Sequence, residues 1–169
     1  MNLHSNIKAS PALIPPATAP TGDTPQPTTV IDRQGFMDLE LLIITGTLAD
    51  SGATWTVLME QSDVAALASG VTDVADADLL GTELGASFTQ AEDSTVIKIG
   101  YRGSKRYVRA TITPSGNAGN APLAAIWVLA QPSIAPQSTQ KIAYSRAGEV
   151  SGRAHGGGAR PETLRGVVS

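Results

Sequence analysis

The sequence has 169 residues, enough for one domain with a buried core, and its length gives no reason to expect a second domain. It is 41% hydrophobic, 16% charged and 4% aromatic, with 17 glycines and 11 prolines, which favours a loop-rich β protein over a helical bundle. The formal net charge is −3, and the absence of cysteine excludes disulfides, thiolate catalysis and cysteine-bound metal.

The two ends of the chain have compositions that predict extensions. Residues 10–29 are rich in proline and threonine without an apolar period, which predicts an extended arm and no strand. Residues 151–169 combine glycine with arginine and predict a tail. We therefore expect an arm over residues 1–29, a folded domain over 30–136 and a tail over 137–169. The start, MNLHSNIKASPALIPP, lacks a continuous apolar stretch, so we expect a soluble chain that is not exported.

The first half of the folded domain contains two predicted strands. Residues 36–48 read FMDLELLIITGTL, and the apolar run in their middle predicts a strand covered on both faces, with burial in the core or against another subunit for Leu41, Ile43 and Ile44. Residues 49–54 supply turn residues, and the alternating stretch TWTVLME follows. This pattern predicts a hairpin whose second strand points Trp55, Val57 and Met59 inward.

The second half contains a short predicted helix and three further strands. Residues 63–69 favour a helix capped by Ser62 or Asp63. Residues 94–114 predict a hairpin that turns at RGSK and buries alternate residues of both strands, namely Ile97, Ile99, Tyr101, Val108, Ala110 and Ile112. Residues 123–130 read LAAIWVLA, apolar on both faces, and should bury Trp127 and Leu129.

These elements together predict an all-β protein, specifically a jelly-roll-like β-sandwich with extended N- and C-terminal arms. Two strands that are apolar on both faces are hard to place in a small sandwich, because one face of each sheet usually meets solvent. Either loops or another subunit should cover them.

The residue types of common active sites are scarce. The two histidines, His4 and His155, both lie in the predicted extensions, which argues against a hydrolase triad and a histidine-bound metal. Asp73, Asp76 and Asp78 could approach a calcium ion, but their spacing differs from that of an EF-hand loop, so a solvated acidic loop is favoured. We predict no catalytic residue, no metal and no cofactor.

One carboxylate pair and one basic segment leave alternatives open. Glu40 and Glu60 could form a glycosidase pair, although the low aromatic content argues against sugar stacking. The segment YRGSKRYVR is a candidate partner-binding strip, formed by Arg102, Lys105, Arg106, Tyr107 and Arg109. Its cations and rings resemble a nucleic-acid strip, but in an acidic chain an acidic protein surface or a solvated tip is favoured.

The charges are distributed unevenly along the chain. Residues 23–93 contain thirteen carboxylates and a single base, Arg33, whereas residues 101–169 contain nine bases and two carboxylates. Such a division suits contacts between copies, in which the acids of one copy meet the bases of another.

Several motifs resemble a family of small virion proteins encoded among the head genes of tailed bacteriophages. These motifs are VIDRQGF, ITGTLAD, VLMEQSD, VADADLLGTELGASFT and IKIGYRGSKRYVRATITP, and the resemblance covers residues 3–136. The arginine-rich ending after Pro136 lies outside it. The resemblance implies a capsid cement or decoration protein of jelly-roll type that binds the major capsid protein as a homo-oligomer, with a trimer as the expected order.

This implied function places the protein in the virion, after a period in the host cytoplasm during assembly, with no role for a membrane or for nucleic acid. A head–tail connector or tail structural protein is the alternative within the virion. A carbohydrate-binding β-sandwich module is the alternative from another class, and it would need an exposed aromatic platform.

Overall fold

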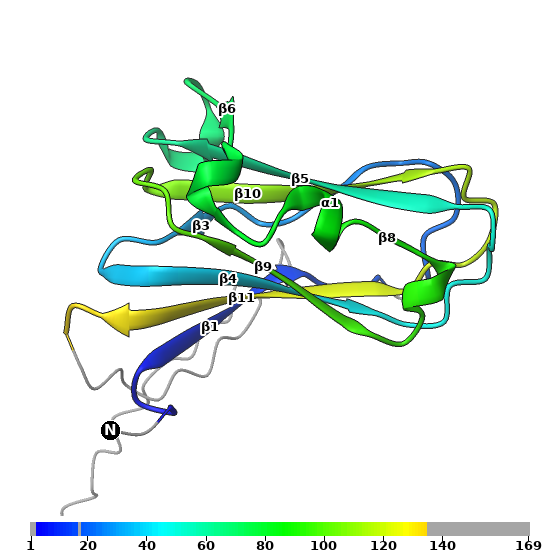
Figure 1. The fold of residues 1–169 in the computed structure, drawn as a ribbon, viewed down its shortest axis with the longest axis horizontal. Coiled ribbons are helices and arrows are strands. Elements are labelled where there is room, and N and C mark those ends of the chain that lie inside the picture. The colour runs from blue at the N-terminus through cyan, green and yellow to red at the C-terminus, as the bar shows by residue number, and fades with distance from the viewer. Residues whose placement is uncertain (1–2, 17, 135–169) are drawn as a thin grey trace, which may run out of the picture.

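The computed structural model describes residues 3–16 and 18–134, which form two antiparallel β-sheets packed face to face (Figure 1). The all-β sandwich expected from the sequence is confirmed. Predictions for the tail over 137–169 and for His155 lie outside the described residues.

Sheet A has five strands in the order β1-β11-β4-β9-β7. Their bounds are Ile7–Leu13 for β1, Leu123–Pro132 for β11, Phe36–Thr45 for β4, Val96–Tyr101 for β9 and Leu79–Leu80 for β7. Four of these strands are long enough to present a continuous face on each side of the sheet.

Sheet B has the order β2-β10-β5-β6, with β3 also paired to β10 and β8 to β5. The bounds are Gln26–Pro27 for β2, Tyr107–Ser115 for β10, Thr54–Ser62 for β5, Thr72–Asp73 for β6, Ile31–Asp32 for β3 and Phe88–Thr89 for β8. The helical segments between strands are α1, Glu83–Ala86, and three 3₁₀ turns at Ala65–Leu67, Asp76–Asp78 and Gln90–Glu92.

Both predicted hairpins are wrong, because the chain changes sheet between the strands concerned. β4 belongs to sheet A and pairs with β9 and β11, whereas β5 belongs to sheet B and pairs with β10. β9 and β10 likewise lie in different sheets. The expected inward residues of β5 and β10 are nevertheless buried, since alternation determines which side chains face the core but not which strand lies alongside.

The expectation that residues 10–29 contain no strand is wrong. β1 pairs antiparallel with β11 along sheet A, with Ile7 opposite Ala130 and Ser10 opposite Trp127. Proline is tolerated there because β1 is an edge strand, and the register shifts after Pro11. The N-terminal segment is thus part of the sandwich, and Ala12 belongs to its core.

The short helix predicted over residues 63–69 is reduced to a single 3₁₀ turn at Ala65–Leu67. Its N-cap is Val64, which has no side-chain capping bond, and Ser62 instead donates from its hydroxyl to the carbonyl of Ser69 at 2.7 Å. Ala66 and Leu67 have positive φ angles, which an α-helix does not allow. The turn therefore reverses the chain locally without adding a helical layer.

The core between the sheets is built around two tryptophans. Trp127 on β11 is fully buried, and its indole N–H donates to the carbonyl of Thr29 at 3.0 Å. Trp55 on β5 stacks on Phe88 with ring centroids 5.4 Å apart. Leu41, Ile43 and Leu129, all expected to be buried, also face this core. In the described part of the chain, no helix is both long and apolar enough to cross a bilayer.

Candidate interaction surfaces

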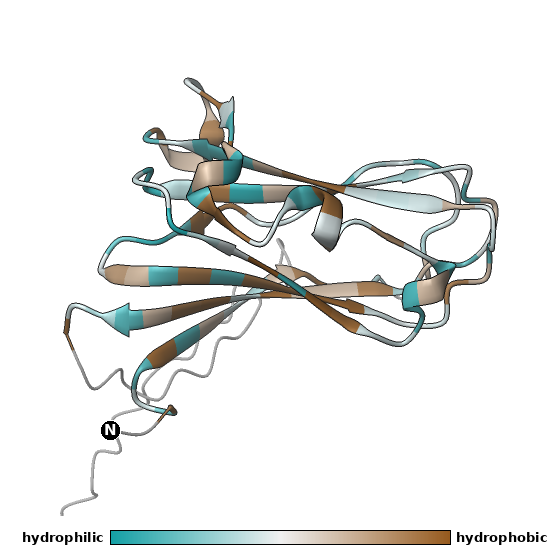
Figure 2. Cartoon of the chain, viewed as in Figure 1, coloured by the Kyte–Doolittle hydropathy of each residue, from teal (hydrophilic) through white to brown (hydrophobic). Residues whose placement is uncertain are grey.

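The two sheets present chemically different faces to solvent. β11 and β9 are coloured largely brown in Figure 2, whereas β5 and β10 carry pale and teal segments. The inward faces of both sheets are apolar, so the difference lies in the outward-facing residues. The two outer faces therefore differ in the kind of contact that they can make.

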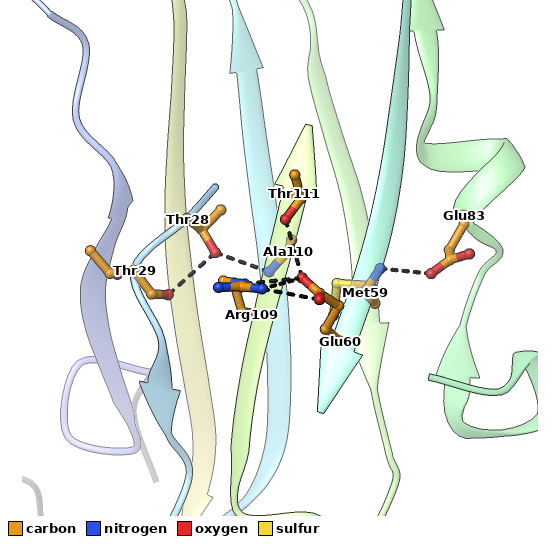
Figure 3. A network of polar contacts seen from close by, with 8 residues as sticks. All are labelled: Thr28, Thr29, Met59, Glu60, Glu83, Arg109, Ala110 and Thr111. Carbon is orange, nitrogen blue, oxygen red and sulfur yellow. Dashed lines mark hydrogen bonds and ion pairs between the residues drawn. The ribbon is translucent and has the colours of Figure 1, made fainter. Parts of the chain in front are cut away.

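The outer face of sheet B is polar and internally satisfied. Its threonines lie on β5 and β10, and its central pair is Arg109 with Glu60, opposite each other on these strands (Figure 3). Arg109 donates to both oxygens of the Glu60 carboxylate at 2.8 to 3.0 Å, and the hydroxyl of Thr111 donates to Glu60 at 3.2 Å. This arrangement is typical of a sheet face that meets water.

Flanking bonds in Figure 3 hold the edges of sheet B in place. The backbone N–H of Ala110 donates to the hydroxyl of Thr28 at 3.0 Å, which ties the segment before β3 to β10. On the other side, the backbone N–H of Met59 donates to the Glu83 carboxylate at 2.6 Å, which fixes α1 against β5.

The predicted partner-binding strip is present at one end of the sandwich, but its bases are engaged within the chain. Lys105 pairs with Asp63 at 2.5 Å, and Arg106 forms a bidentate pair with Asp32 at 2.7 and 2.9 Å while lying over the ring of Tyr107. Arg102 donates to the carbonyl of Ala77. The strip can therefore bind an acidic partner only by competing with these internal contacts.

The carboxylates paired with these bases have lowered pKa values, as expected for an acid beside a cation. Hydrogen bonds from Arg106 hold the pKa of Asp32 below its usual range, and Lys105 lowers the pKa of Asp63 in the same way. Both pairs are partly exposed to solvent, where screening makes an ion pair worth little. Their main effect is to neutralise this end of the molecule.

The outer face of sheet A is apolar across four strands. Inward-facing residues alternate with outward-facing ones, so the buried Leu41 and Ile43 leave Leu42 and Ile44 on the outside. Ile44, expected to be buried in the core or against another subunit, is not in the core and is 38% exposed in the single chain. The outer face of sheet A comprises Ile7, Ala9 and Pro11 on β1, Ala124, Ile126, Val128 and Ala130 on β11, Asp38, Glu40, Leu42 and Ile44 on β4, Val96, Lys98 and Gly100 on β9, and Leu80 on β7.

Two shallow grooves follow the β1 side of this face. One, of about 410 Å³, lies where β1 shifts register against β11 and is lined by Ala9, Ser10, Pro11, Leu13, Ile14, Pro15, Ala124, Ala125 and Ile126. The other, of about 510 Å³, lies at the opposite end and is lined by Leu3, Asn6, Ile7, Met37, Ala130, Gln131, Pro132 and Ser133. Their apolar linings extend the outer face of sheet A towards the free edge of β1.

A carboxylate and an ammonium group lie near the centre of the outer face of sheet A. Glu40 on β4 lies opposite Gly100 on β9, and Lys98 is one outward position further along β9. A Cβ atom at residue 100 would lie 2.7 Å from the Glu40 carboxylate and 2.9 Å from the Leu80 Cβ atom. Glycine at position 100 therefore leaves room on β9 for the side chains of Glu40, from β4 on one side, and of Leu80, from β7 on the other.

The surroundings of Glu40 disfavour its charged form. Partial burial raises the pKa of Glu40, the positive charge of Lys98 only partly offsets this effect, and the negative charge of Asp38 on the same face adds to it. Among the described residues, the Glu40 side chain has no hydrogen-bond partner. A carboxylate that is partly withdrawn from water without a hydrogen bond is unfavourable in the isolated chain.

Replacing Glu40 with glutamine is therefore expected to stabilise the isolated chain at neutral pH. Because the folded state raises the pKa of Glu40, it holds that proton more tightly than the unfolded state, so this residue lowers stability as the pH rises above the unfolded value of about 4.3. The gain from Glu40→Gln should appear above that pH and vanish below it. Urea denaturation of dilute protein across this range measures the difference, and parallel stability curves would contradict it.

The catalytic and metal hypotheses find no geometric support in the described residues. Glu40 and Glu60 lie on the outer faces of different sheets, on opposite sides of the sandwich, so they cannot form a glycosidase pair. No group of three or more histidine and acidic side chains is arranged to hold a metal ion within residues 3–16 and 18–134, which include Asp73, Asp76 and Asp78. His4 is exposed near the start of the chain.

The outer face of sheet A was indicated in the sequence by two strands that are apolar on both faces. These strands are β4 and β11, which lie inside that sheet. The positions of Glu40 and Lys98 were missed as a pair, because only the β4–β9 register brings them together. No protein-family model matches the chain, and no curated protein or solved structure does either.

Proposed function

We propose that the protein is a non-enzymatic structural component of a bacteriophage capsid, a cement or decoration protein that binds the lattice of the major capsid protein and stabilises it. The observation that carries the proposal is the apolar outer face of sheet A, which contrasts with the polar outer face of sheet B. A contiguous apolar face on a soluble sandwich favours contact with another protein. The family resemblance of residues 3–136 supplies the capsid as the setting.

The strand order adds support for a jelly roll. Every long strand of sheet A pairs with a strand that is not its neighbour in sequence, and the chain passes to the other sheet between β4 and β5, β9 and β10, and β10 and β11. Such interleaving of two sheets is typical of jelly rolls, an architecture that includes viral capsid domains.

A cement function follows from binding equilibria and needs no reactive site. A protein that binds only the assembled lattice lowers the free energy of that state relative to its alternatives. Many modest contacts, repeated over a lattice, add through multivalency. The apolar face and the grooves beside β1 are suited to contacts of this kind, whether with the capsid protein or between copies of this chain bound to the lattice.

The carbohydrate-binding alternative is less well supported, because both tryptophans are buried in the core and Tyr107 is covered by Arg106. The head–tail connector alternative differs from cement in copy number. Quantitative mass spectrometry of purified particles should find this chain at a simple lattice fraction of the major capsid protein. A count of about six or twelve per particle would favour a connector ring, and absence from particles would overturn the capsid assignment.

A pair of matched substitutions tests which face the assembly uses. Ile126 on the outer face of sheet A and Leu58 on the outer face of sheet B are 36% and 37% exposed, each on an inner strand of its sheet. Ile126→Asp should reduce the occupancy of particles at least about tenfold, because it places a charge in an apolar contact. Leu58→Asp should leave occupancy unchanged. Equal effects of the two variants would contradict a special role for sheet A.

A further inference from the structure

We infer that the outer face of sheet A packs against the same face of a second copy of this chain, with Glu40 of each copy against Lys98 of the other. The inference deepens the proposed function by naming the occupant of the apolar face, and it rests on that proposal only for the claim that the face is covered in an assembly. The capsid itself is not needed for the contact between copies.

The first argument is that two opposite charges on this face lack hydrogen-bonding partners. Glu40 has no hydrogen bond within the described residues, and neither does Lys98. The other described lysines and arginines all engage an acid, a carbonyl or an aromatic ring. Lys98 is thus the exception among the described bases, and it lies beside the one half-buried carboxylate of the apolar face.

The second argument is geometric. A contact between identical faces has a two-fold axis in the plane between them, and such a contact is self-complementary. The axis that bisects the line from Glu40 to Lys98 exchanges the two positions, so one rotation places each carboxylate against the other copy's ammonium group. Both ion pairs form together, and the partly desolvated Glu40, which within one chain only feels the charge of Lys98 from a distance, gains a hydrogen-bonded cation.

The third argument is that apolar side chains surround Glu40 and Lys98. Leu42, Ile44 and Ile126 lie next to the charged pair, and all would leave water when two such faces meet. From the lengths of β1, β4, β9 and β11, the flat area of the face is roughly 500 Å² per copy, given about 3.3 Å per residue and 4.8 Å between strands.

This area is below the roughly 800 Å² per partner of a standard stable interface. We therefore expect a dimer that dissociates on dilution and is favoured where a lattice holds copies at high local concentration. A two-fold contact also differs from the trimer that the family resemblance implies, and the mass of the oligomer distinguishes the two orders.

Charge reversal in mixed chains tests the contact directly. Sedimentation velocity of the purified full-length chain should detect a dimer that Glu40→Lys and Lys98→Glu each weaken at least about tenfold, because each variant alone opposes like charges across the axis. An equimolar mixture of the two variants should form dimers again, since both positions are basic in one chain and acidic in the other. Each chain keeps its own like-charged pair in the mixture, so an effect within one chain cannot restore association.

Circular dichroism checks that both variants are folded, and Leu58→Asp is the control that should dimerise as the unaltered chain does. A second measurement needs no substitution: zero-length carbodiimide cross-linking of mixed ¹⁴N- and ¹⁵N-labelled chains should link Glu40 to Lys98 between differently labelled copies. A monomer or trimer for the unaltered chain, or a mixture that stays monomeric, would overturn the inference. A lattice-like copy number in particles would still support the capsid assignment, so the two failures are distinguishable.

Discussion

Replacement of Trp127 by alanine should lower the free energy of unfolding by about 3 to 5 kcal/mol, the usual effect of removing a large aromatic side chain from a core. The Trp127 side chain is fully buried on β11, which lies between β1 and β4. Its removal leaves a cavity between the sheets and also removes one of two donors to the carbonyl of Thr29, the indole N–H at 3.0 Å, leaving only the Thr28 hydroxyl at 3.2 Å.

Two matched variants separate these contributions in chemical denaturation. Trp127→Phe keeps most of the ring but lacks the indole N–H, so a smaller loss of about 1 to 2 kcal/mol is expected. Val96→Ala removes an apolar side chain that is 60% exposed, and the change should stay within about 0.5 kcal/mol. An alanine variant at position 127 with unaltered stability would mean that the two sheets do not pack as described.

Removal of residues 1–13 should abolish most of the stability of the domain. This deletion removes β1, whose hydrogen bonds to β11 contribute on the order of 1 kcal/mol each, against a typical total stability of about 5 to 15 kcal/mol. The carbonyls of Pro11 and Ala12 also accept hydrogen bonds from Thr29, which would lose both. The exposed edge of β11 should in addition promote aggregation.

The control is a shorter deletion of residues 1–4, which precede β1. Leu3 and His4 are exposed, so this variant should unfold within about 1 kcal/mol of the complete chain. Thermal unfolding and light scattering measure both effects. If the longer deletion melted like the shorter one, β1 would be a dispensable arm, as the proline content of the sequence had predicted.

The sequence predicted the inward side chains well, because a strand alternates with a period of two residues whatever its neighbours are. Met59, Ile99 and Ile112 were assigned to the core and are fully buried. Pairing was not predictable in the same way. Turn residues between alternating segments indicate a reversal of the chain, and that reversal can join two strands of one sheet or carry the chain to the other sheet.

The N-terminal strand was hidden by Pro11, which weakens a strand pattern everywhere except at an edge. Only part of the candidate surface could be predicted from the sequence. The doubly apolar runs in β4 and β11 indicated a face covered by a neighbour, whereas the relation of Glu40 to Lys98 depends on a register that no local pattern encodes. The cluster of bases around Arg106 could be predicted from the sequence. Their ion pairs could not, because the acidic partners lie far away along the chain.

The pairing of β1 with β11 also has a consequence for how the protein folds. β11 is the last described strand to leave the ribosome, yet it lies between β1 and β4, so neither can complete its side of sheet A before residues 123–132 emerge. Contacts so distant along the chain make folding slow, on the order of milliseconds to seconds for sandwiches of this kind. The nascent chain would meanwhile expose its apolar strands, so we expect its synthesis at high levels to depend on chaperones more than that of a helical protein of equal length.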